Sequence, residues 1–230
     1  MPTKGFIIAI DGPVASGKGT LALKLAQTLN GFYLHTGAMY RCIALMCIDK
    51  GLDLKNESQV ESVLEDLDIS LAGNKVILSG RDVTERIKEP GVASGASEIG
   101  VYPKIREVSV LRQQTIAKNE VSQGKIVVSE GRDTGTVVFP DAPFKLYLTA
   151  KPEVRAHRRM VQYGNLSEDD LIRELEKLKT RDKRDIERET SPLPAEPEAL
   201  GYFVLDNSDL KEEETMSKVI AELKKRKLIK

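Results

Sequence analysis

The hydrophobic positions along the chain follow two patterns, one typical of buried strands and one typical of helices. Residues 6–10, Phe-Ile-Ile-Ala-Ile, form a continuous apolar run of the kind found in strands that are buried on both faces of a parallel sheet. From Lys18 onward leucines recur at helical spacing until Asn30-Gly31, which predicts the end of a helix. The chain therefore opens with a strand, a glycine-rich loop and a helix.

Further helices and strands are predicted along the chain from the same two patterns. Helices are predicted over residues 37–50, 103–120, 152–163, 168–189 and 210–227, and buried strands over residues 125–129, 144–148 and 202–205. Residues 68–83 differ, because their short alternating segments are separated by glycine-containing turns, which predicts a small antiparallel β insertion. Strands that alternate with helices indicate an α/β fold with a mainly parallel sheet.

Composition limits the classes of partner. The 230 residues suggest one large domain with insertions, and 35 basic side chains balance 35 acidic ones. No large net field therefore exists to recruit nucleic acid or a membrane surface, and any anion site has to be built locally. Cys42 and Cys47 are expected to be reduced core residues. Without an apolar stretch long enough for a signal peptide or a transmembrane helix, we expect a cytoplasmic protein.

A phosphate-binding loop follows the first strand. It consists of Gly12, Pro13, Val14, Ala15, Ser16, Gly17, Lys18, Gly19 and Thr20 and matches G-x-x-x-x-G-K with a hydroxyl residue one position later than usual. Glycines let backbone N–H groups wrap a polyphosphate, and Lys18 supplies positive charge for the β- and γ-phosphates. Thr20 and Ser16 are candidates for binding phosphate oxygens or Mg²⁺. The loop does not identify the molecule that accepts the phosphoryl group, because GTPases, ATPases and small-molecule kinases share it.

Two predicted helices carry arginines on one face. Along residues 168–189 three leucines form an apolar stripe, and the same spacing continues through Arg181, Asp185 and Arg188. Inward charges are costly unless they are paired or bound to a ligand, so this face either enters an anion-filled cleft or leaves the protein body and is solvated. Along residues 152–163 the arginines at positions 155, 158 and 159 share a face. This face is either a basic surface patch or part of a flap that covers ATP.

Polar residues also follow the predicted strand at residues 125–129 and a second strand that ends before residue 35. In residues 129–135 Arg132 can bind a phosphate, and Asp133 can accept from an exocyclic amine or position Mg²⁺, although a structural turn with a local ion pair is a rival interpretation. Residues 35–41, His-Thr-Gly-Ala-Met-Tyr-Arg, offer a hydroxyl group, a helix N-terminus and an arginine. His35 and His157 are interpreted as non-catalytic, because a phosphate acceptor that is already ionised needs no general base.

Taken together, these segments resemble those of bacterial cytidylate kinases, which are nucleoside monophosphate kinases of the P-loop class. The similarity runs from about Ile7 to the C-terminal helix and is carried by residues 10–20, 36–41, 130–142, 155–159 and 181–185. It implies a P-loop NTPase-type sheet with a helical lid, and transfer of the γ-phosphoryl group of ATP, with Mg²⁺, to CMP or dCMP. The expected partners are the small-molecule substrates CMP, dCMP and ATP, without nucleic acid or a membrane, and we expect a monomer.

The resemblance further implies a layout and a set of residue roles. The core covers about residues 1–35, 121–150 and 198–230, the monophosphate-binding region about 36–120, and the lid about 151–190. The acceptor is bound by Thr36, Tyr40, Arg41, Ser97, Arg106, Arg132, Asp133, Arg181, Asp185 and Arg188, with Arg41, Arg132 and Arg188 on its phosphate. Asp133 or Ser97 would distinguish the 4-amino group of cytosine from the 4-carbonyl group of uracil.

The catalytic and donor-binding roles come from the same resemblance. The implied catalytic residues are Lys18, Arg132, Arg158, Arg159 and Arg188, and Arg155 joins the loop in binding the donor, with Thr20 at the metal. Members of the family usually carry Asp where His35 stands, so an orienting or Mg²⁺-linked carboxylate is not available there. Two rivals stay open: a P-loop kinase for UMP, AMP or shikimate, and a nucleotide-dependent switch, although the D-x-x-G and [NT]-K-x-D segments of GTPases are missing from the sequence.

Overall fold

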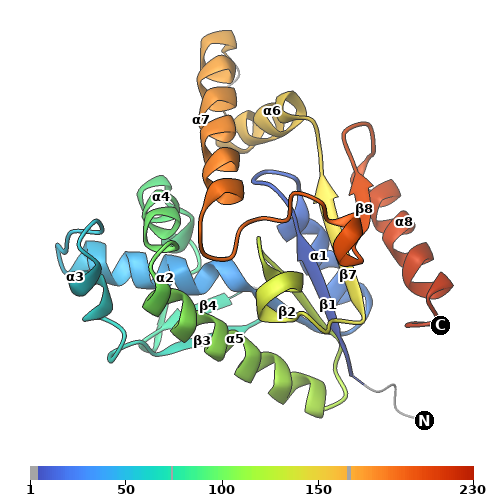
Figure 1. Ribbon diagram of the computed structural model, residues 1–230, viewed down its shortest axis with the longest axis horizontal. Helices are drawn as coiled ribbons and strands as arrows, with labels where there is room; N and C mark the ends of the chain where they lie inside the picture. Colours follow the sequence, from blue (N-terminus) through green and yellow to red (C-terminus); the bar gives the residue numbers. More distant parts are fainter. Residues whose placement is uncertain (1–4, 74, 165–166) are drawn as a thin grey trace.

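A five-stranded sheet forms the centre of the computed structural model, which describes residues 5–73, 75–164 and 167–230. All neighbouring strands are parallel and follow the order β2-β6-β1-β7-β8 (Figure 1). The strands are β1 (Ile7–Asp11), β2 (Phe32–His35), β6 (Val127–Glu130), β7 (Phe144–Thr149) and β8 (Phe203–Asp206). Because β1 lies in the middle, the glycine-rich loop emerges at the centre of the sheet's carboxyl edge.

Helices cover both faces of this sheet, which is why β1 and β6 are buried at nearly every position. On one face, α1 (Lys18–Thr28) and α8 (Glu212–Lys225) pack on Ile8 and Ile10. On the other face, α5 (Pro103–Ser122) packs on Val127 through Ala117. The predicted helices and parallel strands are confirmed, with ends displaced by a few residues.

A second lobe is built on α2 (Thr36–Asp49), to one side of the sheet in Figure 1. It contains α3 (Glu57–Glu61), η1 (Arg86–Lys88), α4 (Pro90–Ile99) and a three-stranded antiparallel sheet of β3 (Ile69–Ala72), β4 (Lys75–Leu78) and β5 (Arg81–Asp82). The predicted β insertion is thereby confirmed. The lobe has its own hydrophobic core, in which Cys42 and Cys47 are buried and free.

The helix α4 is absent from the sequence-based prediction because its glycines and serines are poor helix formers. Tertiary packing stabilises it instead. A Cβ atom at Gly95 would lie 2.6 Å from Leu54 Cδ1 and 3.4 Å from Ala44 Cβ, so the glycine allows α4 to lie close against α2. Through this contact, α4 comes to line a cavity at the carboxyl edge of the central sheet.

A helical pair projects from the carboxyl edge of the sheet, formed by α6 (Pro152–Tyr163) and α7 (Glu168–Glu187) (Figure 1). Ser167 caps α7 by accepting from the Asp170 N–H at 3.2 Å. Leu178 packs with Val14 and Ala156, so the apolar stripe of α7 meets α6 and the glycine-rich loop. After α7 the chain returns across the sheet through η3 (Glu198–Leu200) and enters β8.

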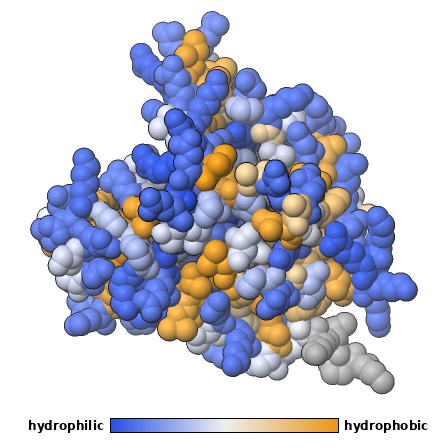
Figure 2. All heavy atoms as spheres, viewed as in Figure 1, coloured by the Kyte–Doolittle hydropathy of each residue, from blue (hydrophilic) through white to orange (hydrophobic). Residues whose placement is uncertain are grey.

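The visible surface is mainly hydrophilic over α7 and over the lobe that contains α2 to α4 (Figure 2). Hydrophobic residues are scattered between these regions. Within the described residues, no helix has both the length and the apolar character needed to cross a membrane.

Candidate active site

The carboxyl edge of the sheet opens into a cavity of about 590 Å³. The glycine-rich loop, α2, α4 and α7 enclose it. It is lined by most of the predicted site residues, namely Val14, Ala15, Gly17, Lys18, Gly19, Thr20, Thr36, Tyr40, Arg41, Ser97, Arg106, Arg132, Asp133, Arg159, Arg181, Asp185 and Arg188. Residues from distant parts of the sequence therefore meet in one cleft.

A second cavity, of about 560 Å³, lies on the other side of the glycine-rich loop. It is lined by Ala15, Gly17, Thr20, Leu21, Arg158, Arg159, Asn207, Leu210, Glu212 and Thr215. Ala15, Gly17, Thr20 and Arg159 border both cavities. The loop and Arg159 thus stand at the junction of two ligand-sized spaces.

The loop is shaped by residues that line neither cavity. A Cβ atom at Gly12 would collide with the carbonyl oxygen of Leu148, so only glycine fits there. Pro13 accepts from Lys18 Nζ at 2.9 Å, which holds the lysine against the loop. Burial, followed by repulsion from Arg132, lowers the pKa of Lys18 to about 7. A bound polyphosphate would reverse this effect by supplying negative charge.

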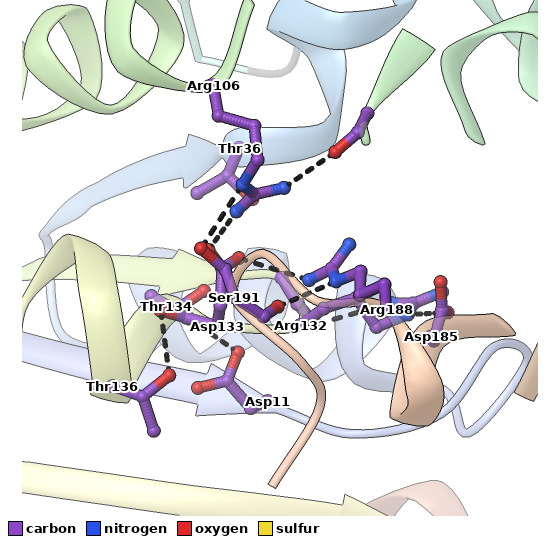
Figure 3. Close-up of polar contacts among 12 residues, drawn as sticks. Asp11, Thr36, Arg106, Arg132, Asp133, Thr134, Thr136, Asp185, Arg188 and Ser191 are labelled. Atoms are coloured by element: carbon purple, nitrogen blue, oxygen red, sulfur yellow. Dashed lines mark hydrogen bonds and ion pairs between the residues drawn. The ribbon is translucent and has the colours of Figure 1, made fainter. Parts of the chain in front are cut away.

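Opposite the loop, a network of arginines and carboxylates connects three elements (Figure 3). Arg106 of α5 pairs with Asp133 and also donates to Ser191 Oγ at 3.2 Å. Arg188 donates to the Ser191 carbonyl at 2.6 Å, and its Nη2 lies 3.9 Å from Asp133 Oδ1. Arg132 donates to Asp185 at 2.7 Å. Asp133 is consequently held between two arginines.

Positive charge is concentrated in the first cavity. Its lining holds Lys18, Lys88 and six arginines, against the carboxylates of Glu130, Asp133 and Asp185. Arg181 Nε and Arg188 Nη2 are buried and hydrogen-bond to none of the described residues. Burial, followed by repulsion from Arg132, lowers the pKa of Arg181 to about 10. Buried cationic groups with open donors indicate a site that binds anions.

Known proteins of one family match this chain over nearly its whole length. The cytidylate kinase family model matches residues 8–225. The cytidylate kinase of Caldanaerobacter subterraneus subsp. tengcongensis is 43% identical over 219 residues, which cover 95% of this chain and 94% of that protein. That of Neisseria gonorrhoeae is 40% identical over 215 residues, covering 93% and 95%. The chain belongs to the cytidylate kinase family.

A solved structure supports the fold of this cytidylate kinase family member. An uncharacterized protein from Eubacterium ventriosum superposes with a TM-score of 0.54, covering 95% of this chain and 98% of the other, at 14% identity. At that identity the likeness concerns the fold alone.

The three arginines of α6 have different partners around the phosphate-binding loop. Arg155 lines neither cavity and bonds to the Val14 carbonyl at 3.0 Å and to Asp182 at 2.6 Å. Arg158 bonds to Asn207, and Arg159 pairs with Glu174 at 2.5 Å. They do not form a single patch. Arg155 clamps the loop, while Arg158 and Arg159 border the second cavity.

Two residues at this site of the cytidylate kinase fold were not among the predicted site residues. Asn207, just after β8, donates to the Ser16 carbonyl at 3.0 Å and accepts from Arg158 at 2.9 Å, so it connects the loop to α6. Glu130, the last residue of β6, lies in the first cavity. Their position at the carboxyl ends of parallel strands was the only sequence signal.

His35 has a partner that sequence spacing did not reveal. His35 and Glu130 are register neighbours on β2 and β6, and His35 Nε2 lies 3.2 Å from Glu130 Oε1. Burial acts to raise the pKa of Glu130, but His35 and Lys18 outweigh it and lower that pKa overall. Burial lowers the pKa of His35 despite Glu130. The pair leaves an ionised carboxylate next to Lys18.

The described residues include no group of three or more histidine, cysteine, aspartate or glutamate side chains that could hold a metal ion. Thr20 is exposed at the junction of the two cavities. Mg²⁺ in nucleotide sites keeps several waters and takes one or two protein ligands together with phosphate oxygens. A single hydroxyl beside a phosphate-binding loop fits an ion of that kind.

Proposed function

We propose that this chain transfers the γ-phosphoryl group of ATP to the phosphate of CMP or dCMP, giving ADP and CDP or dCDP. The observation that carries this proposal is the pair of cavities that meet at the phosphate-binding loop and Arg159. Two nucleotides placed end to end would bring their phosphates together at that junction. The excess of positive side chains in the first cavity would neutralise those phosphates.

In this proposal ATP places its base and ribose in the second cavity and its phosphates along the loop. Lys18 then binds the β- and γ-phosphates and regains a full positive charge. Arg158 and Arg159 complete the donor side, and Arg155 holds the loop in shape through the Val14 carbonyl. Mg²⁺, held by Thr20 and the phosphate oxygens, would supply further charge neutralisation.

The monophosphate would occupy the first cavity. We assign its phosphate to Arg41, Arg132 and Arg188, and its sugar to Arg181 and Asp185. The cytosine would lie among Thr36, Tyr40, Ser97, Arg106 and Asp133. Arg106 stacks over the Tyr40 ring at 5.7 Å, which orients both side chains at this end of the cleft. A carboxylate there accepts from the cytosine amine and has no donor to offer the uracil carbonyl.

Catalysis would consist of positioning and charge stabilisation. The acceptor phosphate is already ionised, so its oxygen attacks the γ-phosphorus without a general base. The P–O bond to ADP breaks as the new P–O bond forms, and the surrounding cations stabilise the charge on the transferred group. We further propose that the enzyme acts as a monomer in the cytoplasm, with α6 and α7 as the lid.

An ADP-release assay with a panel of acceptors tests this proposal. Turnover with CMP and dCMP is expected to exceed turnover with UMP, AMP and shikimate. In Arg188→Ala, kcat/KM for CMP should fall by about 100-fold or more, as expected when a buried arginine leaves a phosphate. Equal or greater turnover with UMP or AMP would overturn the substrate assignment. ATP hydrolysis that no monophosphate alters would favour a nucleotide-dependent switch instead.

A further inference from the structure

A fully buried carboxylate lies beneath the acceptor site and lines neither cavity. Asp11 is the last residue of β1, directly before the phosphate-binding loop, and it is 0% exposed. Burying a carboxylate is costly unless hydrogen bonds compensate, so its partners reveal what it stabilises.

Among the described residues, the carboxylate of Asp11 accepts hydrogen bonds from three donors, all of them outside β1. The N–H groups of Thr134 and Gly135 donate to its two carboxylate oxygens at 2.8 and 2.7 Å (Figure 3). The Tyr202 hydroxyl donates at 2.7 Å. Thr134 and Gly135 begin the short helix η2 (Thr134–Val138), so the carboxylate caps the first turn after Arg132 and Asp133. Burial outweighs these three hydrogen bonds, which favour the ionised form of Asp11, and raises its pKa overall.

The loop that Asp11 caps is closely packed at two glycines, where no side chain would fit. A Cβ atom at Gly131 would lie 2.5 Å from Thr134 Oγ1 and 2.7 Å from Thr36 Oγ1. A Cβ atom at Gly135 would lie 2.6 Å from the Tyr202 hydroxyl. Gly131 therefore lies closely packed between Thr134 and Thr36, and Gly131 and Thr36 line the first cavity together with Arg132 and Asp133.

We infer that Asp11 is a positioning residue for the acceptor: its carboxylate fixes the turn after β6 and so sets the places of Arg132, Asp133 and Thr36. This inference rests on the proposed function, because it assigns those three residues to the monophosphate. In this account β1 contributes to both substrate sites, because the same strand leads directly into the phosphate-binding loop. The side chain of Asp11 serves the acceptor, while the backbone after it serves ATP.

Two variants and two dissociation constants test this role. Asp11→Asn keeps the shape but places an amide donor against backbone N–H groups, and Tyr202→Phe removes one of the three donors. Calorimetry on each folded protein measures the Kd of CMP and, separately, of ATP. For CMP the Kd should rise about tenfold in Asp11→Asn and about threefold in Tyr202→Phe, from the loss of hydrogen bonds to a charged group. The Kd of ATP should stay within about twofold of the wild-type value, because substitutions at sites without shared partners act independently.

The outcomes separate positioning from structural support. If Asp11 only stabilises the fold, Tm falls and both Kd values of the folded protein stay unchanged, which overturns the inference. An equal loss of ATP affinity also overturns it. Should Asp11→Asn fail to fold, Tyr202→Phe decides, and an unchanged Kd for CMP counts against the inference. Wild-type protein that binds no CMP would instead refute the proposed function, so the two failures are distinguishable.

Discussion

Arg132 Nε donates to Asp185 Oδ2 at 2.7 Å and so joins the loop after β6 to α7, 53 positions further along the chain. Both side chains are largely buried and both line the first cavity. Burial acts to raise the pKa of Asp185, but Arg132 outweighs it and lowers that pKa overall. The pair orients an arginine that we assign to the acceptor phosphate and ties that arginine to the proposed lid.

Removing the charge of Asp185 should therefore weaken use of the acceptor. In Asp185→Asn we expect kcat/KM for CMP to fall by about 100-fold, because a buried charged partner of Arg132 is lost. Steady-state kinetics at saturating ATP measures this. Asp169→Asn, the same substitution at an exposed position of α7, is the matched control and should behave as wild type. Equal effects of the two substitutions would show that the ion pair has no part in catalysis.

The lowered pKa of Lys18 predicts that ATP binding takes up a proton. With a pKa of about 7 in the free protein, Lys18 is mostly neutral at pH 8, and bound phosphates would restore its charge. Calorimetry at pH 8 in buffers of different ionisation enthalpy should show net proton uptake of up to one proton per ATP. Lys18→Met should abolish the uptake. Tight ATP binding without uptake in the wild-type protein would contradict the assignment.

The same lowered pKa of Lys18 predicts the direction in which the free energy of unfolding changes with pH. The pKa of Lys18 is lower in the folded protein than the value of 10.5 for the free side chain. Between these two values the unfolded chain binds more protons, so this residue makes the free energy of unfolding rise with pH from about 7 upward. Thermal unfolding of the nucleotide-free protein between pH 7 and 9 tests this. Lys18→Met should lose that part of the pH dependence.

How much of this site the sequence predicts depends on how local each signal is. The phosphate-binding loop lies in consecutive residues, and the stripe of α7 repeats at helical spacing, so both were predicted. The pairing of His35 with Glu130 was not, because it depends on which strands are neighbours, and β2 pairs with β6 across 95 positions of sequence. Asn207 was missed for the same reason. The helix α4 was missed because packing at Gly95 overrides its weak propensity.

We propose that Asp133 recognises the amino group of cytosine, with Ser97 as the alternative. Asp133→Asn replaces an acceptor oxygen with an amide that can donate to a carbonyl, so the ratio of kcat/KM for CMP to that for UMP should fall at least tenfold, as for other sites built around a substrate N–H. The same ratio is measured for Ser97→Ala. The variant that lowers the ratio more identifies the residue that recognises the amino group, and an unchanged ratio in both would exclude these two residues.

A substitution at Gly131 tests how tightly the loop after β6 is packed. Gly131→Ala would bring a methyl group to 2.5 Å from Thr134 Oγ1, so we expect a lower Tm together with weaker CMP binding. Gly91→Ala is the matched control, because nothing lies within 4 Å of its added Cβ. On the exposed first turn of α4 it should instead stabilise the protein by about 0.5–1 kcal/mol. Thermal unfolding and calorimetry measure both effects.

Binding of a bisubstrate analogue tests the central claim most directly, namely that two nucleotides lie end to end across the phosphate-binding loop. The probe joins adenosine and cytidine through a chain of phosphates and is titrated by calorimetry. One molecule should bind per chain, more tightly than ATP or CMP, and either nucleotide should displace it. Both Lys18→Met and Arg188→Ala should weaken it. An analogue that binds no more tightly than ATP, and that leaves CMP binding unchanged, would contradict the account.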